Sequence, residues 1–209
     1  NLIGKKPHEI CKMGVARTFQ NIRLFSELSV LDNVKTGLHN QITYSFAESM
    51  FHLGSYRKKE KQMDEKAMEL LSVFGLEGVA DYRAANLPYG KQRKLEIARA
   101  LATEPKLLLL DEHTAALDPV TADKVLALTR SVVSERSISC LMITHNMHQA
   151  LELGTRTLMM DAGRIVLDVS GPERADMTVQ GLLDAFAAKA GEVFDNDRVL
   201  LSTAEDKAN

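Results

Sequence analysis

Two adjacent carboxylates, Asp111 and Glu112, have the types and the spacing to do chemistry. They follow four consecutive leucines, and an apolar run of this kind predicts a strand buried on both faces of a parallel sheet. Ligands of open α/β sheets bind at the carboxyl ends of such strands. An aspartate there can hold a divalent cation, and a neighbouring glutamate can deprotonate an attacking water. The alternative is that the acids only begin a polar loop, since loops and helix caps favour acids.

Two further polar side chains are expected at strand ends. Gln20 follows a short strand that begins at Val15, and His145 follows an apolar, β-rich run over residues 138–143. Asp118 and a proline after it predict the start of a helix between the leucine strand and that run. Strands joined by a helical crossover run parallel, so His145 is expected at the same sheet edge as the two acids.

A turn-rich stretch, residues 86–93, leads into an amphipathic helix. Gly90 lies at the start of this helix, where free backbone N–H groups and the positive end of the helix dipole favour a phosphate. One glycine is weak evidence, because many such loops only turn. Within the helix, Leu95 and Ala98 are expected to pack while Arg99 points away.

The composition fits a globular chain with one well-buried domain and a small subdomain. The 209 residues are 45% hydrophobic and 26% charged, and residues 40–76 follow a helical pattern. The net charge of -2 gives no case for a nucleic-acid partner. No run of about 20 apolar residues is present, so membrane association is expected to need a partner. Residues 157–160 and 164–169 predict a hairpin at the sheet edge.

Taken together, these motifs resemble the nucleotide-binding subunit of ABC transporters, and the resemblance covers nearly the whole chain. It implies an α/β fold of the P-loop NTPase type, a parallel sheet flanked by helices, with the first strands and the P-loop missing. Residues 1–209 would be a partial ABC ATPase domain, residues 30–95 a helical subdomain with the signature loop, and residues 165–209 a C-terminal extension. The motifs that carry the resemblance are Gln20, the Gly90 loop with residues 97–101 after it, residues 107–112, residues 116–118 and His145.

The resemblance assigns roles to the polar residues at the strand ends. Gln20 would be the Q-loop residue, which senses the metal and the attacking water and couples the site to the membrane partner. Asp111 would be the Walker B residue that holds Mg²⁺, and Glu112 the general base. His145 would be the switch histidine at the γ-phosphate of ATP, and Asp118 would end the D-loop at the dimer interface.

The signature loop implied by the resemblance departs from the family pattern. Leu87, Tyr89, Gly90 and Lys91 would contact the γ-phosphate of ATP held by the opposite subunit. Pro88 and Tyr89 stand where Ser-Gly is commoner, and Lys91 replaces a glutamine, so Lys91 could supply positive charge instead. After the acid pair, a histidine stands where the family usually has proline.

The implied function is an ATP-binding and ATP-hydrolysing subunit of a bacterial importer. Residues 16–25 and 87–90 resemble the ATPases of branched-chain amino-acid importers, whereas the second half resembles an uncharacterised group of amino-acid importer ATPases. The implied partners are a second ABC ATPase subunit in a homo- or heterodimer, transmembrane permease subunits and, indirectly, a periplasmic substrate-binding protein. The implied location is the cytoplasmic face of the inner membrane, and the implied cofactors are ATP and Mg²⁺.

The phosphate-binding P-loop, or Walker A motif, is not found in these residues. Gly4-Lys5 fails its pattern, which needs an earlier glycine and a Ser or Thr after the lysine. The resemblance places the motif before Asn1, so the chain as given is expected to be inactive.

Three alternatives remain open. The chain could be a truncated or chimeric ABC domain that binds a partner without ATPase activity. It could be a soluble ABC ATPase of DNA repair or translation, although neither long coiled coils nor a second domain copy is present. The third is a metalloenzyme, with zinc or iron held by Asp111, Glu112, His113, His145 and His148.

Overall fold

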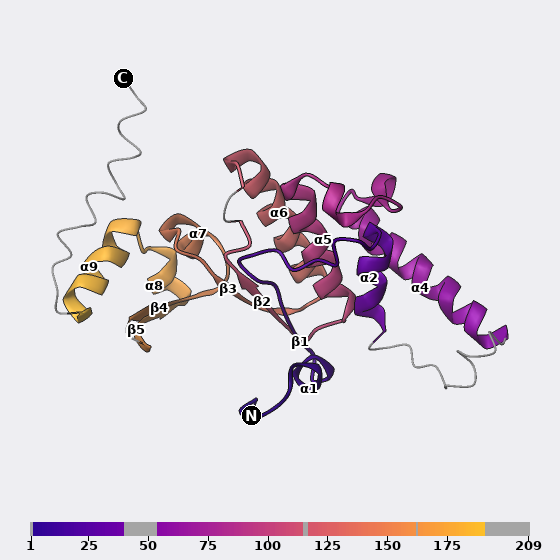
Figure 1. Ribbon diagram of the computed structural model, residues 1–209. Helices are drawn as coiled ribbons and strands as arrows, with labels where there is room; N and C mark the ends of the chain where they lie inside the picture. Colours follow the sequence, from indigo (N-terminus) through magenta and orange to yellow (C-terminus); the bar gives the residue numbers. More distant parts are fainter. Residues whose placement is uncertain (1, 40–53, 115–116, 162, 191–209) are drawn as a thin grey trace, which may run out of the picture. The chain divides into compact units, whose positions relative to one another are not determined.

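The computed structural model describes residues 2–39, 54–114, 117–161 and 163–190 (Figure 1). Contacts divide the chain into two compact units, Asn1–Ile143 and Thr144–Asn209. No helix in the described ranges is both long enough and apolar enough to cross a membrane.

A three-stranded parallel sheet organises the first unit. The strands are β1 (Val15–Arg17), β2 (Leu107–Asp111) and β3 (Ser139–Ile143), in the order β1-β2-β3. In their register, Ala16 pairs with Leu108, which pairs with Cys140. The predicted parallel unit is confirmed, and its crossover is α6 (Pro119–Glu135), which begins where Asp118 and the proline predict. The carboxyl ends of β1 and β2 therefore lie next to each other.

One face of β2 is buried and the other is only partly covered. Leu108 and Leu110 are buried in a cluster that includes Ile97 of α5 (Tyr89–Ala102) and Val125 of α6. Leu107 and Leu109 are half-buried. The prediction that both faces are buried is therefore wrong for the described residues, because the side chains of α5 and α6 cover only the face that carries Leu108 and Leu110.

The helices of the first unit begin where the sequence supplies caps. Ser29 accepts a hydrogen bond from the Asp32 backbone N–H, which satisfies an otherwise unpaired amide at the start of α2. Asp118 accepts from the Thr121 N–H at the start of α6 in the same way. The other helices of this unit are α1 (Pro7–Lys12), α2 (Val30–Leu38), α4 (Gly54–Val73), η1 (Glu77–Val79) and η2 (Ala84–Asn86).

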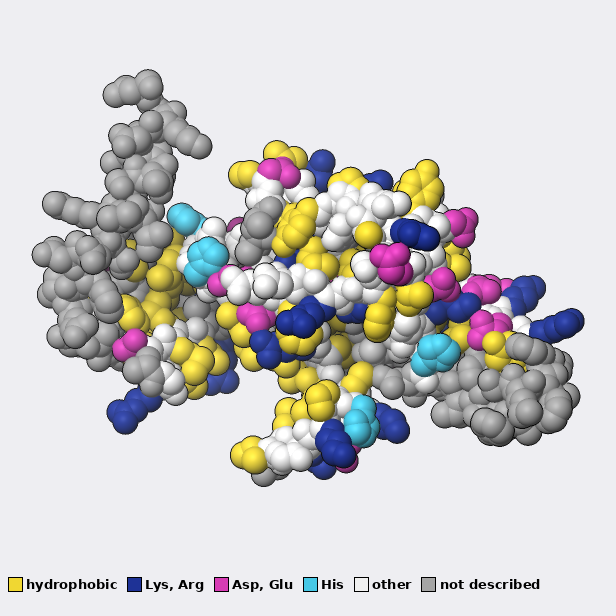
Figure 2. All heavy atoms as spheres, viewed as in Figure 1, with side chains coloured by type: hydrophobic (Ala, Val, Ile, Leu, Met, Phe, Trp, Pro, Cys, Tyr) yellow, Lys and Arg dark blue, Asp and Glu magenta, His cyan; other side chains and the backbone are white. Residues whose placement is uncertain are grey.

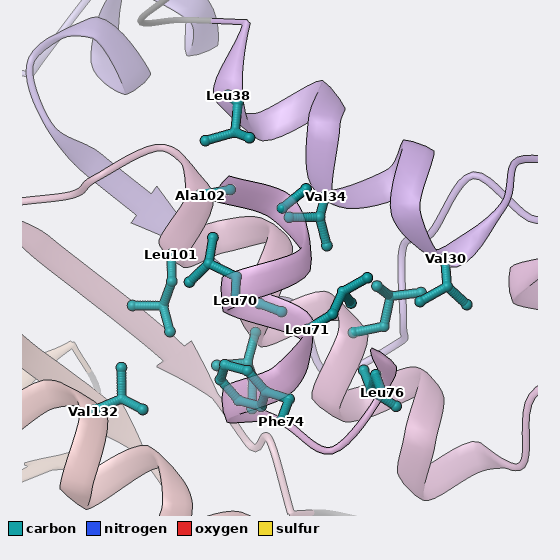
Figure 3. Close-up of a cluster of buried hydrophobic side chains, with 14 of the residues drawn as sticks. Val30, Val34, Leu38, Leu70, Leu71, Phe74, Leu76, Leu101, Ala102 and Val132 are labelled. Atoms are coloured by element: carbon teal, nitrogen blue, oxygen red, sulfur yellow. The ribbon is translucent and has the colours of Figure 1, made fainter. Parts of the chain in front are cut away.

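The largest buried cluster joins α2, α4 and α5 (Figure 3). The apolar face predicted for the helical stretch is buried, and part of that stretch, residues 40–53, lies outside the described residues. At 20–33 cal/mol per Å² of apolar surface, this burial supplies most of the stabilisation of the unit. The members of the predicted face are Met63, Ala67, Leu70, Leu71 and Phe74.

The second unit is built on an antiparallel hairpin. Strands β4 (Arg156–Asp161) and β5 (Arg164–Ser170) pair as predicted, and they form a two-stranded sheet that shares no strand with the main one. The helices of this unit are α7 (Met147–Glu152), α8 (Gly171–Ala175) and α9 (Val179–Ala190). Arg174 of α8 joins this helix to the end of α7, because its guanidinium donates to the carbonyl oxygens of Leu151 and Leu153 at 2.7 and 2.6 Å.

We expect Gly37→Ala to destabilise the first unit, because α5 leaves no room for a Cβ at this position of α2. A Cβ at residue 37 would lie 2.6 Å from the Arg99 carbonyl oxygen and 2.8 Å from the Ala102 Cβ. Overpacking of this kind costs roughly 1–3 kcal/mol of unfolding free energy, measurable by urea denaturation. Gly78→Ala is the control, since a Cβ there meets nothing within 4 Å. Equal stability of the two variants would contradict this packing.

Candidate functional site

The predicted Gln20 and Glu112 meet at the carboxyl edge of the main sheet. The Gln20 amide Nε2 donates to the Glu112 carboxylate Oε2 at 2.7 Å, across 92 residues of sequence. This contact is possible because β1 and β2 are neighbours, so the segments that leave them start side by side. Glu112 has a φ of 41°, in the left-handed region that non-glycine residues rarely adopt. Strained backbone of this kind occurs preferentially at functional sites.

Asp111 ends β2 with a partly exposed carboxylate. Its Oδ2 lies 2.6 Å from the Arg17 guanidinium, and its side chain is 21% exposed. Its backbone N–H donates to the Thr18 hydroxyl at 3.4 Å. Mg²⁺ is usually held by one or two carboxylates together with waters and substrate phosphates, so one accessible aspartate at a strand end fits this ion. A cation at this position would compete with Arg17 for the carboxylate.

The described residues do not support a zinc-type centre. No group of three or more His, Cys, Asp or Glu side chains in the described ranges is arranged to hold a metal ion. Structural zinc sites use four such ligands and catalytic ones three. The metalloenzyme alternative draws on both units, since His145 and His148 belong to the second, and it stays a prediction.

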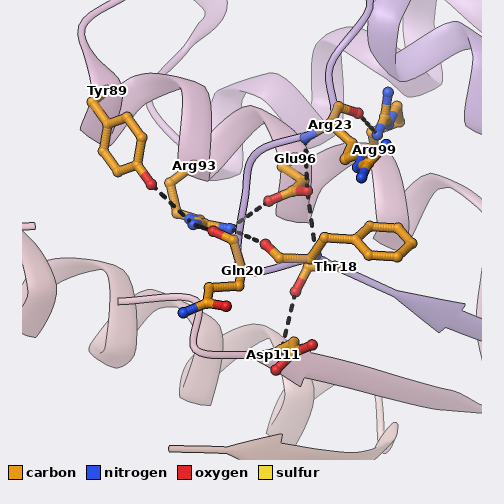
Figure 4. A network of polar contacts seen from close by, with 9 residues as sticks. Thr18, Gln20, Arg23, Tyr89, Arg93, Glu96, Arg99 and Asp111 are labelled. Atoms are coloured by element: carbon orange, nitrogen blue, oxygen red, sulfur yellow. Dashed lines mark hydrogen bonds and ion pairs between the residues drawn. The ribbon is translucent and has the colours of Figure 1, made fainter. Parts of the chain in front are cut away.

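A buried ion pair on α5 holds the backbone of the segment that carries Gln20 (Figure 4). Arg93 and Glu96 have side chains that are 0% and 2% exposed, and their Nη1 and Oε2 atoms lie 2.7 Å apart. Arg93 also donates from Nη1 to the Phe19 carbonyl oxygen and from Nη2 to the Gln20 carbonyl oxygen, both at 2.7 Å. Buried charges persist only when they are paired and hydrogen-bonded, and this pair meets both conditions.

Glu96 binds backbone N–H groups of the same segment. Its Oε1 accepts from the backbone N–H groups of Phe19 and Arg23, at 3.4 and 3.2 Å. The two side chains therefore bind carbonyl and amide groups on either side of Gln20. Neither Arg93 nor Glu96 was predicted as a site residue, because an Arg and a Glu three positions apart on a helix usually form an exposed pair. The sequence did offer one indication that Arg93 is buried. It lies four residues before Ile97, and residues four apart lie on the same face of a helix.

Arg99 differs from its prediction. Its guanidinium donates to the Arg23 carbonyl oxygen and lies 5.4 Å from the centroid of the Phe25 ring. The expectation that it points away is wrong, because the segment after Gln20 folds over this part of α5 and offers the guanidinium a carbonyl and an aromatic face.

The predicted signature loop forms the start of α5. Leu87 is buried, Pro88 is the N-cap, and the first turn contains Tyr89, Gly90 and Lys91. Gly90 is required sterically, because a Cβ there would lie 2.8 Å from Thr121 Cγ2 of α6. The loop thus lies against the first turn of α6.

Tyr89 joins this loop to the buried pair, because its hydroxyl accepts from Arg93 Nη2 at 3.2 Å. At the start of α6, hydrogen bonds from Thr121 hold the pKa of Asp118 below its ordinary value, so this carboxylate is charged in its capping role. Residues 115 and 116 of the predicted D-loop lie outside the described residues.

His113 is buried directly after the acid pair. Its side chain is 1% exposed, and its Nε2, like Nε of Arg93, has no hydrogen-bond partner among the described residues. Burial lowers the pKa of His113 from 6.5 to about 4, and the nearby charge of Arg93 adds to this shift. The imidazole is therefore neutral near pH 7.

His145 belongs to the second unit, in the turn that precedes α7. Asn146 beside it caps this helix by accepting from the Gln149 N–H at 3.1 Å. The roles assigned to His145 and to the signature loop stay predictions.

A hollow of about 620 Å³ opens on the first unit beside the site. It is lined by residues 21–25 and Arg99. Phe25 in this lining is 53% exposed. Figure 2 shows hydrophobic and basic side chains close together on this side of the first unit. A surface that combines exposed aromatic rings with arginines is typical of protein–protein interfaces.

The chain belongs to the ABC transporter family. The family pattern described as "ABC transporter" matches residues 3–115, which include Gln20, the Gly90 loop and the acid pair. The matched range thus includes the parallel strands β1 and β2 and the two carboxylates at the end of β2.

Individual relatives extend the similarity beyond the acid pair. The chain is 34% identical over 165 residues to the high-affinity branched-chain amino acid transport ATP-binding protein BraF of Pseudomonas aeruginosa, covering 79% of this chain and 65% of BraF. It is 34% identical over 174 residues to a tyrosine transport ATP-binding protein of Clostridioides difficile, covering 82% of this chain and 66% of that protein. The chain thus spans about two thirds of the length of these relatives.

A solved structure has the same fold and contains the products of ATP hydrolysis. It is the dimeric post-hydrolysis state of an ATP-binding cassette bound to ADP and phosphate, with a TM-score of 0.64 and 25% identity. The match covers 80% of this chain and 68% of that one.

We expect acid to destabilise the folded protein partly through His113. Because its folded pKa lies below 6.5, the unfolded chain binds the proton more readily, so this contribution is complete above pH 6.5 and is lost as the pH falls to about 4. The loss amounts to about 3 kcal/mol of unfolding free energy. Urea denaturation between pH 7 and 4 should show a shallower decline for His113→Gln than for the wild type. His8→Gln, at an exposed position, is the control, and equal slopes for all three proteins would contradict the prediction.

Proposed function

We propose that this chain is the catalytic part of an ATP-hydrolysing subunit of a bacterial amino-acid importer. The observation that carries the proposal is the hydrogen bond between Gln20 and Glu112 beside Asp111. It gathers an amide, a general-base candidate and a cation-binding carboxylate at one sheet edge. The family and the relatives in amino-acid transport support the proposal.

In the proposed reaction, the residues of this edge position a water and take its proton. Glu112 would accept the proton of a water that attacks the γ-phosphorus of ATP, while the bond to the β-phosphate breaks and ADP leaves. The Gln20 amide fixes the direction of the carboxylate through its hydrogen bond. Asp111 would supply an anionic oxygen for Mg²⁺ after displacement of Arg17 from the carboxylate. Bound Mg²⁺ would neutralise charge that spreads over the phosphate oxygens during transfer. His145 would donate a hydrogen bond to the γ-phosphate.

The proposed assembly has two contact surfaces. The start of α5, with Leu87, Tyr89, Gly90 and Lys91, would face ATP on a second ATPase subunit. A similar cassette forms a dimer with ADP and phosphate bound, which supports a two-subunit assembly. Asp118 would lie at the same interface. The hollow beside Arg99 would receive a transmembrane permease subunit at the cytoplasmic face of the membrane, with a periplasmic binding protein acting through that permease.

Residues 1–209 lack the Walker A pattern, so we propose that ATP turnover needs residues outside this range. The alternative is a truncated or chimeric domain without ATPase activity. It predicts that no form of the protein hydrolyses ATP. Phosphate release should therefore be measured both for residues 1–209 and for the protein expressed from its whole gene. We expect turnover only in the second, and turnover in neither would favour the alternative.

We expect Glu112→Gln to lower kcat for ATP by about 100-fold or more, because a general base contributes about 10²–10⁴-fold. The Kd for ATP should change little, since the amide keeps the shape of the side chain. The measurements are steady-state phosphate release and equilibrium nucleotide binding, in the protein expressed from its whole gene. Glu135→Gln is the control, because Glu135 is the last residue of α6 and its carboxylate accepts a hydrogen bond from the exposed Ser131 hydroxyl, away from the sheet edge. Normal turnover by Glu112→Gln would exclude Glu112 as the base.

A further inference from the structure

We propose that Arg93 is a positioning residue, which holds Gln20 against Glu112 through the backbone on which Gln20 stands. This inference rests on the proposed function, because it concerns the same catalytic edge. The Gln20 side chain reaches Glu112, while its own carbonyl oxygen accepts from Arg93 Nη2 at 2.7 Å. The direction of the Gln20 side chain therefore depends on where α5 places the guanidinium.

The donors of Arg93 are divided between this segment and its own helix, and its Nε N–H has no partner among the described residues. A guanidinium has five N–H groups. Two of the four on Nη1 and Nη2 go to the carbonyl oxygens of Phe19 and Gln20, one goes to Glu96, and one goes to the Tyr89 hydroxyl. Glu96 completes the arrangement by accepting from the amides of Phe19 and Arg23.

The same guanidinium contacts the start of α5 and the segment of Gln20. Its Nη2 donates both to Tyr89, in the loop proposed to meet nucleotide, and to Gln20. A displacement of Tyr89 would therefore move Arg93 Nη2, the atom that is hydrogen-bonded to the Gln20 carbonyl oxygen.

Arg93→Lys distinguishes the positioning of Gln20 from stabilisation of the fold by the ion pair. A lysine keeps the charge opposite Glu96, but its single nitrogen cannot reach the carbonyl oxygens of Phe19 and Gln20 and the Tyr89 hydroxyl together. In the protein expressed from its whole gene, we expect kcat for ATP to fall at least about tenfold with little change in KM, as misplacement of a catalytic group does. Arg83→Lys is the control, since Arg83 pairs with Glu27 at the surface.

A double-mutant cycle tests whether Arg93 acts through Gln20. If it does, Arg93→Lys should lower kcat little further in a Gln20→Ala background, because the group it positions is already absent. Effects that multiply, or a kcat that Arg93→Lys leaves unchanged, would overturn the proposal while the proposed function stands.

Hydrogen exchange gives a readout that does not need ATP turnover. In Arg93→Lys, the peptide that covers residues 18–24 should exchange about tenfold faster, the equivalent of one lost hydrogen bond. The peptide that covers β2 should be unchanged. If Arg93→Lys does not fold, Glu96→Gln replaces it, because the amide keeps an acceptor oxygen for Phe19 and Arg23, and the same direction is expected. Unchanged exchange over residues 18–24 would overturn the proposal even if the protein proved not to be an ATPase.

Discussion

The buried ion pair between Arg93 and Glu96 is the interaction on which the arrangement of the site depends. Removing two charges from water costs several kcal/mol per ion, and the cost is offset only when the pair is well hydrogen-bonded. Here the partners that complete the hydrogen bonding are the backbone groups of residues 19, 20 and 23. The requirement to satisfy these charges therefore fixes the segment that carries Gln20.

The sheet supplies the second constraint. Parallel pairing of β1 with β2 brings residues about 90 positions apart to one edge, where Gln20 meets Glu112 and Arg17 meets Asp111. The sheet fixes where the two chain segments begin, and the pair on α5 fixes how the first of them continues. Together they place an amide and two carboxylates at one edge of the sheet, where the proposed phosphoryl transfer would need them.

Much of this organisation could be predicted from the sequence. The strand of leucines, the cap at Asp118 and the apolar face of α4 follow periodicity and capping rules, and the structure confirms them. The roles of Arg93 and Arg99 could not be predicted, because the backbone carbonyls that they bind come from a segment more than 70 residues away. The half-exposed face of β2 was also missed, since a run of leucines carries no alternation that distinguishes its two faces.

The most direct test of the account is a structure of the protein, expressed from its whole gene, with Mg²⁺ and a non-hydrolysable ATP analogue. We predict that Mg²⁺ lies next to the Asp111 carboxylate, directly or through one water, with Arg17 displaced. The γ-phosphate should face Gln20 and Glu112. A nucleotide bound elsewhere, or an Asp111 that still pairs with Arg17 and has no cation beside it, would contradict the account.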